Sequence, residues 1–394
     1  MNSKIFKRLK IIFLSGVSNL SISLSNLLIS YLVIFITSPE FWGSFVYVII
    51  TFDIAFNVIS WGNRPYLIRE YSLYPKDISK RWQDSFLYRT ILLLIFIVII
   101  LLLGYSPQIT SSLIIWAIAR FIYQSFDAMI QYYRDFPFSI FIELTSLAII
   151  IIPVLILKSD LDLSKVIYLY TISVGFKAIT ELLYYRKTIL KKFKIDFNIK
   201  NIVDYYGTSF PFLLLTFSGM LQTRLDLYIV AVFLSKAEVG KYQVLVGFLI
   251  FSQYIGSLFL SPFARNIFRL SRKALNKLEK IYISTGVLTT LILTALIYLI
   301  LQYLYKLEFT ALTFILSYFY ILPSYVYALR NYQLGKVNKQ KTAAIYAFSG
   351  RFVNLIFSFA LVPVLNIDGA LLSGVIAKIF LTLIYNHKVI LNKI

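Results

Sequence analysis

The chain has 394 residues, of which 59% are hydrophobic and only 14% are charged. Soluble domains have about 45–50% apolar and about 25% charged residues, so this composition excludes an ordinary soluble protein and indicates a chain surrounded mainly by lipid. A formal net charge of +21 would suit nucleic-acid binding if the basic residues covered a soluble surface, but their distribution along the chain excludes that function.

Apolar segments recur along the whole chain between short polar joints, and most approach the roughly 20 residues that a membrane-spanning helix needs. They predict an all-α integral membrane protein with about twelve spans. The first six are Ile11–Ile36, Phe41–Trp61, Thr90–Leu103, Ser111–Tyr132, Phe138–Leu157 and Val166–Tyr185. The second six are Tyr206–Phe233, Val239–Pro262, Tyr282–Tyr303, Phe309–Leu329, Thr342–Val364 and Gly369–His387. We expect the short third span to extend back toward Phe86.

The basic residues concentrate on alternate joints. With a cytoplasmic N-terminus, the inner joints carry 29 Lys and Arg residues and the outer joints carry five. Because positive residues favour the cytoplasmic side, this asymmetry predicts that both termini are cytoplasmic. The chain contains no cysteine, which excludes thiolate ligands, and no metal site is predicted.

The chain divides near its midpoint. A basic stretch begins at Arg186, and it predicts a cytoplasmic linker at residues 186–204 between two six-helix bundles, residues 1–185 and 205–394. The segment Ser38–Phe45 is similar to Ser235–Tyr242, and their glycines, Gly43 and Gly240, are 197 residues apart. Six helices per half preserve orientation, so the halves are predicted to be parallel repeats with binding sites between them.

Four segments carry a family resemblance. Tyr206–Pro211, Thr223–Ile229 and Glu238–Tyr242 resemble the seventh-to-eighth helix signature of Wzx-type polysaccharide flippases, and Gly62–Glu70 is similar to the end of that family's second helix. The family belongs to a superfamily that also holds multidrug extruders and lipid II flippases. The first half carries a looser copy, with one extra residue between its glutamate and its glycine.

The resemblance implies a fold like that of the multidrug extruders, with two six-helix bundles around a central cavity. It also implies translocation of undecaprenyl-pyrophosphate-linked oligosaccharide units from the cytoplasmic to the periplasmic leaflet, for O-antigen or other surface polysaccharide synthesis. The expected location is the bacterial inner membrane, among membrane lipids, with a polysaccharide polymerase and a chain-length regulator as possible partners. No nucleic acid and no cofactor are expected, while coupling to H⁺ or Na⁺ is left open.

Charged residues inside the predicted spans give the candidate site. An ionisable side chain there costs about 2.5–3.5 kcal/mol on insertion scales, so it normally faces a cavity or a partner. A guanidinium also matches a pyrophosphate in bidentate geometry. The predicted cationic cavity is lined by Arg224, Arg351, Arg120 and Lys378. The candidate ion-coupling groups or charge partners are Asp226, Asp53, Asp127 and Glu143. The predicted polar lining is Asn19, Asn26, Gln124 and Asn354.

Helical spacing sharpens these predictions. Arg120, Gln124 and Asp127 fall on one face, as do Arg351 and Asn354 with Ser358. Structural alternatives stay open: Arg120 could pair with Asp53, and Lys177 with Glu181, four residues further on. The row Ser15, Asn19, Ser23, Asn26 and Ser30 on the first helix fits either a wet lumen or close helix packing.

Three other functions compete with this one. A cation-coupled multidrug extruder shares the architecture but favours an acidic or aromatic cavity, whereas the central charges here are mostly basic; it is the alternative function. A major-facilitator sugar transporter is disfavoured because the segment Gly62–Arg89 lacks the Gly-x-x-x-Asp-Arg pattern. A membrane polymerase would need a long outer loop and a cluster of acid/base residues, and neither is visible, so the chain is not predicted to be an enzyme.

Overall fold

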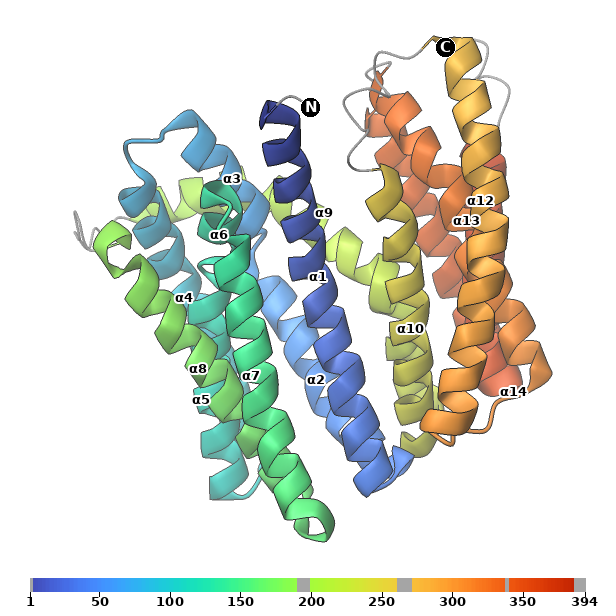
Figure 1. Ribbon diagram of the computed structural model, residues 1–394. Coiled ribbons are helices and arrows are strands. Elements are labelled where there is room, and N and C mark those ends of the chain that lie inside the picture. Colours follow the sequence, from blue (N-terminus) through green and yellow to red (C-terminus); the bar gives the residue numbers. More distant parts are fainter. Residues whose placement is uncertain (1–2, 190–198, 261–270, 337–339, 386–394) are drawn as a thin grey trace. The chain divides into compact units, whose positions relative to one another are not determined.

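The computed structural model describes residues 3–189, 199–260, 271–336 and 340–385, and every regular element in this part of the chain is a helix (Figure 1). The helices before residue 190 are α1 Ser3–Ile36, α2 Pro39–Ser60, α3 Asn63–Leu73, α4 Ile78–Leu102, α5 Pro107–Gln124, α6 Asp127–Tyr133, α7 Phe136–Leu157, η1 Lys158–Asp160 and α8 Leu163–Ile189. Those after it are α9 Ile199–Phe233, α10 Lys236–Leu260, α12 Arg272–Leu299, η4 Ile300–Leu304, α13 Ala311–Lys336 and α14 Gln340–Tyr385.

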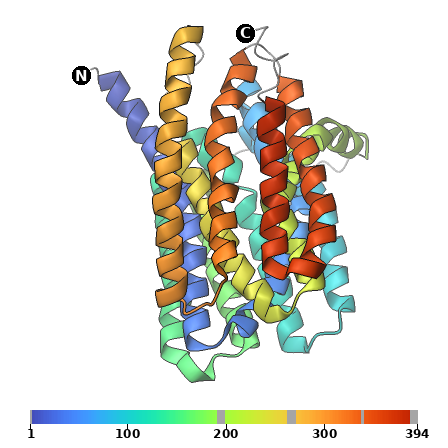
Figure 2. The same ribbon diagram turned by 90° about the vertical axis from the view of Figure 1, so that its right-hand side faces the viewer.

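The described helices confirm a multi-pass, all-α membrane protein. Eight of the described helical segments are long and apolar enough to cross a bilayer. Each predicted span overlaps a described helix, although the predicted ends Pro262 and His387 lie outside the described residues, and α4 begins at Ile78, well before Phe86. The last two predicted spans are the two arms of α14, because the backbone leaves helical geometry at Asn366, whose φ is 53°. Figure 2 shows these arms side by side, and Ser358 on one contacts Ser373 on the other at 2.7 Å.

Two breaks in the helices position the polar groups described below. The backbone turns at Trp61 and Gly62, both with positive φ, so that α3 starts at Asn63 rather than continuing α2. A Cβ atom on Gly62 would lie 2.4 Å from the carbonyl carbon of Phe212, so only glycine allows α9 to approach this turn so closely. A second turn separates α5 from α6, which begins at Asp127.

The chain forms two compact units. Unit 1 comprises Met1–Ile12, Ser38–Gly43 and Leu221–Ile394, and unit 2 comprises Phe13–Thr37 and Ser44–Met220. Within unit 2, α8 lies against α4, α5 and α7, and within unit 1, α13 lies against α10, α12 and α14. The predicted six-helix boundaries, with a linker at 186–204, stay a prediction.

The two glycines of the predicted repeat meet inside unit 1, where α2 and α10 begin. A Cβ atom on Gly43 would lie 1.7 Å from the carbonyl oxygen of Lys236, and one on Gly240 would lie 2.2 Å from that of Pro39. In each case the carbonyl belongs to the residue four positions before the other glycine, so the contact is reciprocal and in the same register. This local symmetry supports the predicted equivalence of Gly43 and Gly240.

Candidate functional site

Unit 2 contains a polar pocket of about 160 Å³ within its membrane-spanning part. We call it the inner pocket; its lining residues are Phe56, Asn57, Ser60, Asn63, Arg64, Arg120, Gln124, Asp127 and Thr216. They come from α2, α3, α5, α6 and α9. The predicted common face of Arg120, Gln124 and Asp127 is confirmed, because all three line this pocket despite the turn between α5 and α6.

Arg120 takes the alternative that the sequence left open. Its Nη2 atom donates to Oδ1 of Asp53 on α2 at 2.7 Å, and both side chains are largely buried. The guanidinium also lies 4.8 Å from the ring centroid of Phe56, which favours the cation further. Arg120 is therefore both an ion-pair partner and a lining residue of the inner pocket.

Lys177 has a different partner from the one expected. Its Nζ atom donates to Oε2 of Glu143 on α7 at 2.6 Å, so the predicted pairing with Glu181 is wrong. Packing of α7 against α8 supplies a closer carboxylate than the next turn of α8 does. Glu181 is instead 4% exposed, and its Oε2 atom has no hydrogen-bond partner among the described residues.

Asn63 and Arg89 are polar residues of this region that the sequence reasoning missed. Asn63 is 2% exposed; its Oδ1 atom accepts from Ser85 at 2.6 Å, while its Nδ2 atom has no partner among the described residues. Arg89 was assigned to a cytoplasmic joint, yet it lies within α4, fully buried, and donates to Ser85 and Ser125. The sequence signal that could have found Asn63 is the glycine before it, because Gly62 marks a turn in the backbone.

The polar row predicted on α1 differs in exposure along its length: Ser30 is buried, Ser15 and Ser23 are half-buried, Asn26 is exposed, and the side chain of Asn19 lies outside the described residues. Ser18, Ser21 and Ser25 of the same helix are also buried. Ser18 contacts Ser139 of α7 at 3.0 Å, which is typical of close packing between helices at small residues. This contact agrees with the packing alternative, and a cavity lining by Asn19 and Asn26 stays a prediction.

Unit 1 holds a second polar group, around Asp226 of α9. The Asp226 carboxylate is buried and accepts from the hydroxyl of Tyr242 at 2.6 Å and from that of Tyr320 at 3.3 Å. Lys378 of α14 donates to the Tyr320 carbonyl at 2.9 Å, and its ammonium lies 3.2 Å from the Tyr320 ring centroid. Lys378 and Asp226 also interact electrostatically. Tyr320 therefore contacts both Asp226 and Lys378, which are two of the predicted site residues.

The other predicted residues of unit 1 lie elsewhere. Asn354 accepts from Ser358 at 3.2 Å and from Ser373 at 3.1 Å, so its amide ties the two arms of α14 together. Arg351 is half-buried on the same helix, one turn earlier. Arg224 lies on α9, and its side chain is outside the described residues. A cationic cavity formed by these residues stays a prediction.

The described residues contain no group of three or more His, Cys, Asp or Glu side chains able to hold an ion.

Comparisons with known proteins identify the fold. The structure of the lipid II flippase MurJ in an inward closed conformation matches with a TM-score of 0.65 and 17% identity, covering 96% of this chain and 87% of that one.

The structure of the MATE multidrug transporter DinF-BH, solved as a complex, matches with a TM-score of 0.62 and 12% identity, covering 100% of this chain and 96% of that one. No family model and no curated protein sequence matches the chain. At such low identities the likeness shows a shared fold of membrane transporters and does not assign a substrate.

Proposed function

We propose that the protein is a flippase, not an enzyme, that moves polyprenyl-pyrophosphate-linked oligosaccharides from the cytoplasmic to the periplasmic leaflet of the bacterial inner membrane. The observation that carries the proposal is the inner pocket, in which guanidinium and amide donors line a polar space inside spanning helices. The family resemblance of Gly62–Glu70 and the shared fold with a lipid II flippase agree with it. Surface polysaccharide synthesis, with a polymerase and a chain-length regulator as partners, is part of the proposal.

The inner pocket suits an anionic head group because its donors are already oriented. Arg120 is held over Phe56 by Asp53, and an entering phosphate oxygen would exchange with the carboxylate as the partner of Nη2. The unsatisfied Nδ2 atom of Asn63 offers a further donor, since a buried amide without a partner costs about 1–3 kcal/mol. Arg224, Arg351 and Lys378 are proposed as later contacts along the pathway.

A second candidate is cation-coupled extrusion of drugs. The observation that favours it is the buried Glu181 carboxylate, which has an oxygen without a hydrogen-bond partner in the described part of unit 2. A carboxylate in this state favours either a proton or an organic cation. Coupling of lipid transport to H⁺ or Na⁺ would use the same group, so Glu181 alone does not separate the two candidates.

Reconstitution separates them. The full-length protein in proteoliposomes is expected to move a polyprenyl-pyrophosphate-linked oligosaccharide between leaflets, measured by access of an impermeant glycosidase, and to leave a cationic fluorescent dye where it is. Arg120→Gln with Asp53→Asn, which removes both charges, should reduce lipid movement at least tenfold at equal protein content. Dye export without lipid movement would establish the extruder instead.

A further inference from the structure

Unit 2 also contains a larger polar pocket of about 400 Å³, and we call it the mouth pocket. Its lining residues are Tyr66, Asp77, Lys80, Arg81, Asp84, Tyr88, Asn201, Asp204, Tyr205 and Thr208. They belong to α3, the turn after it, α4 and the first turns of α9. The basic joint in which Lys80 and Arg81 stand is cytoplasmic under the predicted orientation.

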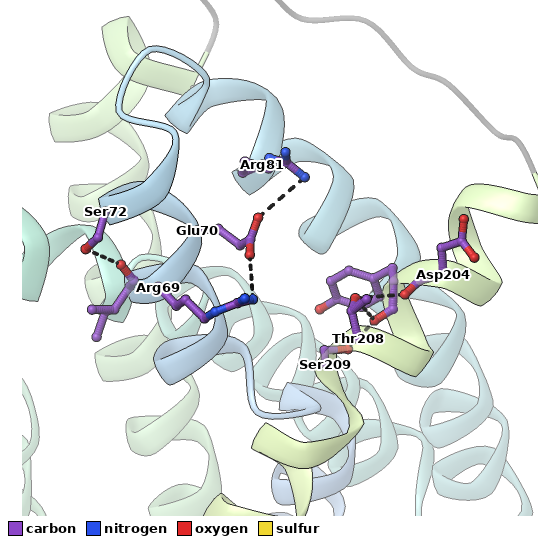
Figure 3. Close-up of polar contacts among 9 residues, drawn as sticks. Arg69, Glu70, Ser72, Arg81, Asp204, Thr208 and Ser209 are labelled. Carbon is purple, nitrogen blue, oxygen red and sulfur yellow. Dashed lines mark hydrogen bonds and ion pairs between the residues drawn. The ribbon is translucent and has the colours of Figure 1, made fainter.

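The mouth pocket has a fixed wall. Tyr66, Tyr88 and Tyr205 are buried, and the rings of the first two pack edge-on or tilted against Tyr205, at centroid distances of 5.3 and 5.4 Å. Glu70 lies between Arg69, at 3.1 Å, and Arg81, at 3.5 Å, as Figure 3 shows. Glu70 therefore helps to hold Arg81 in place, and its single charge is shared between two arginines.

Other lining side chains of the mouth pocket are open to a ligand. The side chains of Asp77, Lys80 and Asp204 make no hydrogen bond or ion pair with other described residues, and Asp77 forms no side-chain cap on α4. Thr208 lies one turn after Asp204 on α9, with its hydroxyl donating to the Asp204 carbonyl at 2.7 Å (Figure 3). The lining thus contains carboxylate acceptors together with an ammonium and a hydroxyl group.

This lining discriminates between ligand classes. Among the lining side chains without a partner in the described structure, two are carboxylates, Asp77 and Asp204, and one is an ammonium, Lys80, so this pocket suits a phosphate less well than the inner pocket does. A sugar hydroxyl both donates and accepts hydrogen bonds, and neighbouring hydroxyls on one ring therefore need acceptors and donors side by side. A volume of about 400 Å³ falls in the range of small-molecule pockets.

The two pockets of unit 2 are joined by a hydrogen-bond chain. Ser85 donates to Asn63 of the inner pocket at 2.6 Å, and the Tyr205 hydroxyl, in the wall of the mouth pocket, contacts the Ser85 hydroxyl at 2.9 Å. Since the Ser85 proton goes to Asn63, the Tyr205 hydroxyl donates to Ser85. A ligand that spans the two pockets would meet donors for an anion in one and a mixed lining for hydroxyls in the other.

We infer that the mouth pocket binds the glycan of the lipid-linked substrate, as a neutral or amino-substituted saccharide, while the pyrophosphate occupies the inner pocket. This inference rests on the proposed function. Asp204 and Thr208 are exposed in the described structure, so their replacement tests the pocket without disturbing the core. The test variant is Asp204→Ala with Thr208→Val, and the matched control is Asp160→Ala, an exposed aspartate on η1.

Transport in proteoliposomes gives the first readout. The double variant should move a glycan-bearing polyprenyl pyrophosphate about tenfold more slowly than wild type, as expected for loss of one charged acceptor and its neighbour. Its affinity for the sugar-free polyprenyl pyrophosphate should be unchanged, and the Asp160→Ala control should match wild type with both lipids. Equal loss with both lipids, or no loss with either, would overturn the inference.

A second readout separates this inference from the proposed function. Free di- and trisaccharides of hexoses and N-acetylhexosamines should give saturation-transfer NMR signals with the wild-type protein in nanodiscs, and the double variant should abolish them. If wild type binds these saccharides but moves no lipid, the flippase proposal fails and the saccharide site stands. If spermidine binds and no saccharide does, the pocket is a polyamine site and the inference fails.

Discussion

Carboxylates within the helices of the two units have different kinds of partner. In unit 2, two such carboxylates have cations as partners: Asp53 pairs with Arg120, and Glu143 pairs with Lys177. In unit 1 the described partners are hydroxyls: two tyrosines for Asp226, and two threonines for Asp368, at 2.9 and 2.6 Å. A carboxylate paired with a cation interacts with it mainly through its charge. A carboxylate that accepts from hydroxyls can keep those hydrogen bonds when its charge is screened. These two pairs of unit 2 therefore depend on charge more than the hydroxyl contacts of unit 1 do.

The largest effect is expected when one charge of a unit 2 pair is removed. Arg120→Ala leaves Asp53 buried without its cation and should destabilise the protein by about 3–5 kcal/mol. Arg120→Gln with Asp53→Asn removes both charges and should restore most of that loss. Fluorescence-detected size-exclusion chromatography after heating measures both, and a double variant no better than the single one would show that the pairing is not what stabilises unit 2.

The next effect tests close packing in unit 1. Gly43→Ala places a methyl group where the Lys236 carbonyl oxygen now stands and should cost about 3 kcal/mol, because overpacking forces the backbones apart. Gly175→Ala in α8 is the matched control, since nothing lies within 4 Å of a Cβ atom placed there. That control should be neutral or stabilising by about 0.5–1 kcal/mol. Similar melting temperatures for the two variants would contradict the close approach of α2 and α10 at Gly43.

The hydroxyl partners of unit 1 should matter less than the ion pairs of unit 2. Tyr242→Phe removes the 2.6 Å donor to Asp226 and should cost about 2 kcal/mol, the usual range for a bond to a charged group. Because Tyr320 and the Leu227 amide still donate to the carboxylate, the loss should stay below that of Arg120→Ala. A loss as large as that of Arg120→Ala would erase the contrast between the units.

The smallest effect is expected at the edge of unit 1. Thr313→Val removes one of two hydroxyl donors to Asp368, which is half-buried, and should cost about 1 kcal/mol. Thr310→Val removes the longer bond, and its residue is exposed, so the cost should be smaller still. Thermal denaturation of the two variants side by side would show whether hydroxyl bonds in this unit scale with burial.

Much of this arrangement follows from local rules of sequence. Hydropathy predicts the helices because bilayer thickness fixes their length, and three- and four-residue spacing predicts that Arg120, Gln124 and Asp127 share a pocket. The repeat predicts that Gly43 and Gly240 are equivalent, and their reciprocal contact agrees.

What the sequence leaves open depends on how each helix is rotated against its neighbours. Lys177 pairs with Glu143 because α7 presents it, and a spacing rule confined to α8 favours Glu181. The serines of α1 can form more than one row, and packing on α7 selects the row that contains Ser18. Arg89 is counted with a cytoplasmic joint by charge, although serine partners hold it inside unit 2.

The glycine crossing of α2 and α10 also has a consequence for conformational entropy. Neither Gly43 nor Gly240 has a rotamer to order, so this contact forms without loss of side-chain freedom. Each Cα–H group that faces a carbonyl contributes only about 0.5–1 kcal/mol. At the two glycines the crossing therefore fixes spacing and register by excluded volume rather than by strong attraction.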